Sequence, residues 1–197
     1  MNYILFYKGN FPDYATYSIN NILNIDLKAK VYLCTDIDPK IKNVKYLDPN
    51  NFITEKIKSI IEMNIYKDSN YENNNLWINS LLRVFYLESI INNLKISSFV
   101  HFDLDVLIYK PFKELEQLLN IKKINITRLT DSEIIFSYSF VPNIEIYNKF
   151  CKLFYEKIVY KYKNEEKMEI NEMELISMIE KDNPQLFNIL PSLPYDS

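Results

Sequence analysis

The sequence predicts an α/β fold in which a mainly parallel central sheet is flanked by helices. Two observations support this prediction. Short apolar segments of strand length alternate with longer segments whose apolar residues recur at helical spacing, and the alternation begins at the N-terminus, as in sheets built from strand–helix–strand units. The 197 residues, of which 48% are hydrophobic, suffice for a single domain with a sizeable core.

Each element follows from its apolar pattern and from the residues that end it. The apolar run Asn2–Tyr7 stops at Lys8-Gly9-Asn10, which is typical of a buried strand that leads into a loop. Helical spacing then predicts a helix over Ala15–Ile25. By the same reasoning, strands are expected at Ala29–Asp36, Val44–Leu47, Ser97–Ile108, Lys123–Leu129 and Ser132–Val141, and helices at Leu76–Leu94, Ile144–Tyr162 and after Asn171-Glu172-Met173. A polar segment, 163–173, precedes that last helix, and a tail interrupted by prolines, 183–197, follows it.

Composition and charge argue against several classes of function. A net charge of −3, with Lys and Arg interleaved among Asp and Glu, disfavours a nucleic-acid partner. The single glycine, Gly9, excludes glycine-rich phosphate loops, and one histidine with two distant cysteines excludes the common zinc spacings. Because Cys34 and Cys151 lie in apolar segments, we expect buried reduced thiols. No segment has the length of a membrane span and the first residues lack a signal-peptide pattern, so we expect a cytoplasmic protein.

Two carboxylates interrupt an apolar segment that otherwise has the pattern of a buried strand. Asp103 and Asp105 lie two residues apart, so in a strand they would share a face and converge on one point. Buried carboxylates without a partner are costly, and a pair of them suits a hard divalent cation that also binds phosphate oxygens. Asp36 ends another expected strand, and ligands of parallel sheets gather at that edge. The alternative is a pair of solvated loop acids, because the D-x-D pattern alone is common.

The residues around the D-x-D pattern resemble those of glycosyltransferases with the GT-A fold. In that family an apolar triplet, Lys-Pro and an amphipathic segment follow the motif, as they do in Phe99–Leu118. Trp77–Leu94 resembles the family helix whose arginine faces the nucleotide-sugar, and Arg83 is the matching residue. Weaker similarities to family segments are found at Ala15–Leu23, Ser137–Phe154 and Asn171–Ser177.

The resemblance implies one Rossmann-like domain, with residues 1–105 as the nucleotide-sugar-binding half and residues 106–197 as the acceptor-side half. It implies transfer of a sugar from a nucleotide-sugar, for which we expect a UDP-sugar, to an acceptor that is a glycan, a protein or a lipid. A divalent cation, Mn²⁺ or Mg²⁺, would be bound by Asp103 and Asp105. There it would neutralise the charge of the departing diphosphate.

Four residues are expected to bind the donor, and most of them have a simpler structural explanation. Arg83 would offer a planar fork of donors to diphosphate or sugar oxygens, or else form a salt bridge on the helix surface. Asp103 would contact the metal, the ribose or the sugar. Tyr7 would flank the base or pack as a core aromatic, and Asp36 would bind the base or ribose or cap a turn. A lone histidine in a strand is more often a packing residue, so we leave His101 out of the site.

For an acid near the acceptor we single out Glu172, with Asp131 and Glu133 as further candidates, because an inverting transferase needs a base for the acceptor hydroxyl. The polar sequence around Glu172 instead favours a solvated surface acid. Two alternative functions stay open. One is a catalytically silent domain that binds a nucleotide-sugar. The other is a phosphatase of the haloacid-dehalogenase type, whose first motif resembles Phe102–Ile108 but contains a Gly-Thr pair that this chain lacks.

Overall fold

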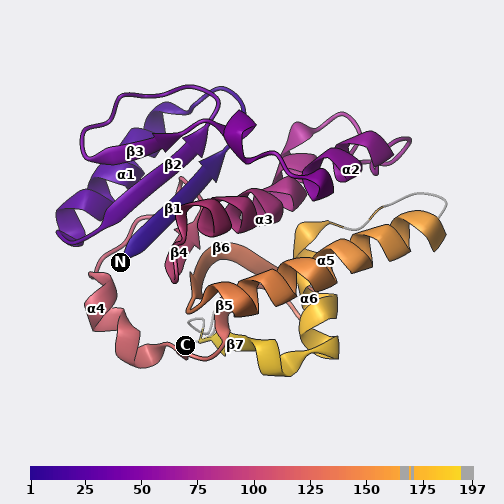
Figure 1. The fold of residues 1–197 in the computed structure, drawn as a ribbon. Helices are drawn as coiled ribbons and strands as arrows, with labels where there is room; N and C mark the ends of the chain where they lie inside the picture. The colour runs from indigo at the N-terminus through magenta and orange to yellow at the C-terminus, as the bar shows by residue number, and fades with distance from the viewer. Residues whose placement is uncertain (165–168, 170, 192–197) are drawn as a thin grey trace.

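The computed structural model describes residues 1–164, 169 and 171–191, and over these residues the chain forms a seven-stranded sheet with helices on both faces (Figure 1). The strands are β1 (Asn2–Tyr7), β2 (Lys30–Thr35), β3 (Val44–Leu47), β4 (Phe99–Phe102), β5 (Ile124–Arg128), β6 (Ile134–Val141) and β7 (Phe187–Leu190), in the order β3-β2-β1-β4-β6-β5-β7. The first four run parallel, β6 is antiparallel to β4 and β5, and β7 is parallel to β5. The predicted α/β fold with a mainly parallel sheet is confirmed.

The helices cover the sheet because the strands bury side chains on both of their faces. They are α1 (Asp13–Ile25), α2 (Glu55–Met63), α3 (Asn75–Leu94), α4 (Phe112–Leu115), α5 (Ile144–Asn164) and α6 (Glu172–Asp182), with short 3₁₀ turns at Pro49–Phe52, Glu116–Leu118 and Pro184–Leu186. In β1, Tyr3 and Leu5 belong to the core formed with α1, whereas Ile4 and Phe6 belong to the core formed with α3, α5 and α6. This alternation holds the carboxyl end of β1 between two packed layers.

Four elements differ from the sequence-based prediction. The strand expected over Ser97–Ile108 ends at Phe102, and Asp103 begins a turn in which the Val106 N–H donates to the Asp103 carbonyl at 3.1 Å. The sequence pattern also missed α2, α4 and β7, and β7 lies in the segment that we described as a tail interrupted by prolines. Residues 165–168 and 170 of the predicted polar segment, and 192–197 of the predicted tail, lie outside the described residues.

The two cysteines are free and buried, as predicted. Burial raises the pKa of Cys34 to about 12 and that of Cys151 well above its ordinary value, so both are neutral thiols at pH 7. Within the part of the chain that the structure describes, no helix has both the length and the apolar character needed to cross a membrane.

Candidate functional site

A cleft of about 470 Å³ opens at the carboxyl ends of β1 and β4, the edge at which parallel sheets gather ligands. Its walls come from the ends of β1 and β4, the first turn of α1, the N-terminal half of α3, β6 and the start of α6. The residues that line it are Phe6, Tyr7, Lys8, Tyr14, Asn75, Leu76, Trp77, Asn79, Ser80, Arg83, Asp103, Leu104, Asp105, Ile135, Phe136, Glu172 and Met173. Most of the residues selected from the sequence therefore meet in one cleft.

Asp103 and Asp105 face this cleft from the turn that follows β4. They are brought together by the turn and not by the alternation of a strand, which corrects the geometric argument made from the sequence. The side chain of Asp103 is 40% exposed, and Asp105 is exposed as well. Such a pair fits a hard cation that takes its remaining ligands from water and phosphate oxygens. Among the described residues there is no cluster of three or more His, Cys, Asp or Glu side chains that could hold a metal.

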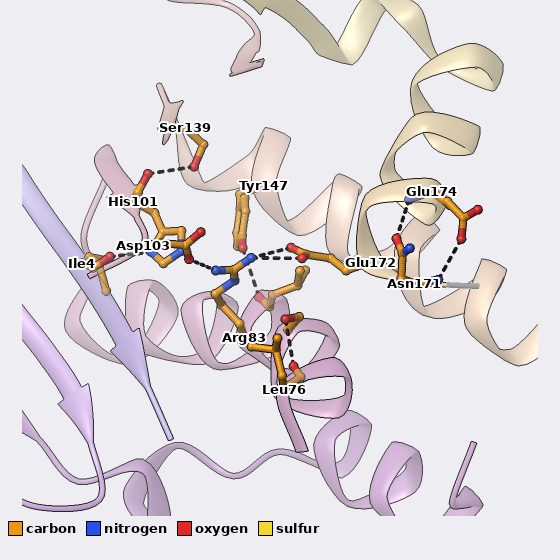
Figure 2. A network of polar contacts seen from close by, with 12 residues as sticks. Ile4, Leu76, Arg83, His101, Asp103, Ser139, Tyr147, Asn171, Glu172 and Glu174 are labelled. Atoms are coloured by element: carbon orange, nitrogen blue, oxygen red, sulfur yellow. Dashed lines mark hydrogen bonds and ion pairs between the residues drawn. The ribbon is translucent and has the colours of Figure 1, made fainter. Parts of the chain in front are cut away.

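Arg83 projects from α3 into the wall of the cleft and joins two acids that are distant in the sequence (Figure 2). Its Nη1 donates to Asp103 Oδ1, and its Nη2 donates to both oxygens of Glu172 at 2.9 and 3.0 Å. The residue is only 9% exposed, so the salt bridge on the helix surface that we considered is wrong. Burial works against the guanidinium charge, but the two carboxylates outweigh it and raise the pKa of Arg83, which stays charged.

Glu172 is the first residue of α6, directly after the N-cap Asn171, whose side chain accepts from the Glu174 N–H at 3.1 Å. The cap fixes where α6 begins, and therefore where Glu172 points. Glu172 is 4% exposed, so the interpretation as a solvated surface acid is wrong. Burial raises the pKa of Glu172, while its contact with Arg83 acts in the opposite direction. Asp131 and Glu133 lie in the loop between β5 and β6 and are not among the residues that line the cleft.

His101 lies on β4 beneath the cleft and is completely buried. Its Nδ1 is 2.7 Å from the carbonyl of Ile4, and burial together with the charge of Arg83 lowers the pKa of His101 to about 3. The ring is therefore neutral at pH 7, with its proton on Nδ1 donated to Ile4, and it ties β4 to β1. This agrees with its interpretation as a packing residue.

A second hollow of about 510 Å³ lies beside the cleft, between the residues that follow β1 and β2 on one side and α2, α3 and the segment that connects them on the other. Asp36 lines this hollow, and its Oδ2 accepts the Gly9 N–H at 2.8 Å, so it does cap a turn. Tyr7 is half-buried at the mouth of the cleft, with its ring 6.4 Å from that of Phe11. The sequence reasoning overlooked Lys8 and Tyr14, although Lys8 directly follows a predicted strand and so had to lie at the same edge of the sheet.

Comparison with solved structures identifies the fold. Mouse xyloside xylosyltransferase 1 matches with a TM-score of 0.59 and 14% identity, over 96% of this chain and 85% of that chain. Galactosyltransferase LgtC, solved with donor and acceptor sugar analogues, matches with a TM-score of 0.55 and 12% identity over 91% of this chain and 70% of its own. The glycosyltransferase GlyE of Streptococcus pneumoniae TIGR4 matches with a TM-score of 0.58 and 11% identity, over 96% of this chain and 44% of its own.

No protein-family model and no curated protein sequence matches this chain. The structural matches nevertheless extend over nearly its full length, and the fold is that of the GT-A glycosyltransferases, as the D-x-D segment and the Arg83 helix predicted. At identities of 10–14%, this likeness concerns the fold.

Proposed function

We propose that the protein is a metal-dependent glycosyltransferase, which transfers a sugar from a nucleotide-sugar, most simply a UDP-sugar, to a glycan, protein or lipid acceptor. The observation that carries the proposal is the placement of Asp103 and Asp105 together in one cleft at the carboxyl edge of a GT-A sheet. In this proposal the donor occupies the half of the chain formed by residues 1–105, and residues 106–197 form the acceptor side.

The two carboxylates would hold Mn²⁺ or Mg²⁺, which when bound supplies positive charge to the departing nucleoside diphosphate. Arg83 orients Asp103, because its guanidinium holds that carboxylate on one side and Glu172 on the other. Tyr7 at the mouth of the cleft and Asp36 beside it would contact the donor. A donor contact of Arg83 itself remains a prediction, since both of its Nη atoms already donate to carboxylates.

One observation favours a second candidate, a domain that binds a nucleotide-sugar without turning it over. Glu172, the residue we singled out as the acid near the acceptor, is buried and held by Arg83 through both of its oxygens. A base must be able to reach the hydroxyl whose proton it removes. To act as that base, Glu172 would first have to leave Arg83. A retaining transferase needs only to position the acceptor, so it would not require this movement of Glu172.

A thermal-shift series with nucleoside diphosphates tests the binding that both candidates share. A ligand present at about 100 times its Kd stabilises the folded state by about 2.7 kcal/mol, which for a chain of this size raises Tm by about 5–10 °C. We expect this shift with Mn²⁺ and not with excess EDTA, and we expect Asp105→Ala to abolish it. Asp131→Ala, which removes an exposed acid outside the cleft, is the matched control.

Turnover separates the candidates. Release of nucleoside diphosphate from the matching nucleotide-sugar, with water or an added acceptor, supports the transferase, whereas Mn²⁺-dependent binding without release supports the silent domain. Hydrolysis of a simple aryl phosphate in the absence of any nucleotide would instead support the phosphatase alternative. An equal thermal shift in EDTA would contradict the metal bridge.

A further inference from the structure

We propose that Lys8, a cation that lies where the cleft meets the second hollow, binds the phosphate oxygens of the donor. The proposal rests on the proposed function. Lys8 is the first residue after β1, and it lines both the cleft that contains Asp103 and Asp105 and the neighbouring hollow that contains Asp36. Its side chain is half-buried, so it has a restricted range of positions and still reaches solvent.

The two hollows adjoin each other, and the described residues that line both are Lys8, Asn75 and Asn79. Their volumes of about 510 and 470 Å³ each fall in the range of small-molecule sites. A nucleotide-sugar has two bulky neutral ends, the nucleoside and the sugar, joined by an anionic diphosphate. When each end occupies one hollow, the diphosphate lies at the junction, where Lys8 and the two asparagines are.

The charges of the cleft leave Lys8 available for an anion. Of the two cations that line the cleft among the described residues, Arg83 already donates to Asp103 and Glu172 and is buried between them. In the described part of the chain, no ion pair involves Lys8, and its Nζ lies 6.0 Å from the centre of the Tyr86 ring. An ammonium group is a compact charge that binds phosphate well, and a cleft with low-dielectric walls strengthens that attraction.

The turn after Lys8 is built in a way that fixes its position. Gly9, the only glycine of the chain, has φ +120°, a conformation that side-chain-bearing residues rarely adopt. A Cβ at this position would meet nothing closer than Tyr7 Cε1 at 3.9 Å, so the glycine is needed for its conformation and not for space. The bond from its N–H to Asp36 then ties the turn to the end of β2. Both features hold the backbone on the C-terminal side of Lys8.

Calorimetric titrations of the intact protein with pyrophosphate, with UDP, GDP, ADP and CDP, and with the matching nucleosides test the proposal at fixed Mn²⁺ and low salt. Lys8→Met keeps the length and apolar stem of the side chain and removes its charge. Lys28→Met is the matched control, because it removes an exposed charge from the opposite, amino end of the parallel strands. Tm values in the absence of ligand establish that each variant is folded.

We expect Lys8→Met to lower the affinity for pyrophosphate and for the preferred nucleoside diphosphate by roughly 10- to 100-fold, which is the range for the loss of a hydrogen bond to a charged group. The affinity for the nucleoside alone should not change, and Lys8→Arg should restore most of the loss. Lys28→Met should bind every ligand as the wild type does. Because the interaction is ionic, added salt should reduce the difference in pyrophosphate affinity between the wild type and Lys8→Met.

The proposal would be overturned if the wild type and Lys8→Met bound pyrophosphate and the nucleoside diphosphate with equal affinity. It would also be overturned if Lys8→Met lost as much affinity for the nucleoside as for these two phosphate ligands. Two further outcomes separate it from the proposed function. If a nucleoside diphosphate binds through Mn²⁺ and Asp105 but not through Lys8, the proposed function stands and the role of Lys8 is refuted. If pyrophosphate binds through Lys8 and no nucleoside diphosphate binds, the anion site stands and the proposed function is refuted.

Discussion

Replacing Arg83 by methionine should destabilise the protein far more than replacing a surface arginine. The guanidinium neutralises Glu172, whose side chain is 5% exposed, and Asp103, whose side chain is 40% exposed. Removing one partner of a buried pair costs about 3–5 kcal/mol, because the other charge stays buried without compensation. Glu172 accounts for most of this figure, since water screens the half-exposed Asp103. For a chain of this size the loss corresponds to a Tm lower by about 6–20 °C.

Urea unfolding followed by circular dichroism measures this loss, and a double-mutant cycle assigns it. Arg83→Met combined with Glu172→Gln leaves no buried charge on α6, so the double variant should recover a large part of the deficit. Arg128→Met is the control, because Arg128 pairs with Glu180 at 2.7 Å through side chains that are 29% and 15% exposed. Its loss should be smaller than that of Arg83→Met.

The pH dependence gives a second test of the same reasoning. Burial raises the pKa of Glu172 in the folded protein, and the variant lacks Arg83, the group that opposes that rise. A carboxyl group whose folded pKa exceeds its unfolded value stabilises the fold as the pH falls through the folded pKa. The deficit of Arg83→Met should therefore shrink as the pH is lowered from 7. A loss below about 1 kcal/mol, the value of a surface pair, or a deficit that Glu172→Gln leaves unchanged, would refute the buried-triad interpretation.

Three further predictions concern Asp105, His101 and the two cysteines. Asp105→Ala should leave the metal-free protein as stable as the wild type or slightly more stable in thermal melts, because it relieves repulsion with Asp103; a large loss would make the pair structural. In EDTA, the free energy of unfolding should fall as the pH drops from about 6.5 toward 3. Over this range the unfolded chain binds a proton at His101, whereas the folded state does not, because the pKa of His101 is lowered to about 3. His101→Gln should therefore make the stability less dependent on pH. Cys34 and Cys151, as buried neutral thiols, should react with a thiol reagent only after unfolding; rapid reaction of the folded protein would contradict their burial.

The sequence was sufficient for the features that depend on local pattern. Alternating apolar runs located β1 and α3, and strand ends therefore placed Asp36 and Asp103 at one edge of the sheet. The turn at Asp103 was not predicted, because an apolar run that continues to Ile108 does not reveal where backbone pairing stops. In the structure the pairing of β4 with β6 ends at Phe102.

The features that the sequence did not reveal depend on distant contacts. Glu172 lies in a polar segment and is buried only because α6 brings it to Arg83, which is 89 residues away. β7 is a short apolar run between Pro184 and Pro191, and it becomes a strand because the edge of β5 pairs with it in parallel. α2 carried a readable signal, since Thr54 accepts from the Ile57 N–H as an N-cap, and a search for caps would have located it.

The single glycine offers a final prediction, which connects the fold to the proposed anion site. Gly9→Ala should lower the free energy of unfolding by about 1–3 kcal/mol, which is the strain of an L residue in a sparsely populated backbone region. The strain arises from the φ of +120°, because no atom crowds the new Cβ. A D-alanine prefers positive φ and should be tolerated. It can be introduced in a synthetic peptide of residues 1–33 ligated at Cys34, with glycine and L-alanine peptides as matched controls. If the turn positions Lys8, the L-alanine protein should also lose affinity for pyrophosphate, whereas the D-alanine protein should retain both its stability and its affinity. Equal behaviour of the two alanine proteins would show that the conformation of Gly9 is not what the turn requires.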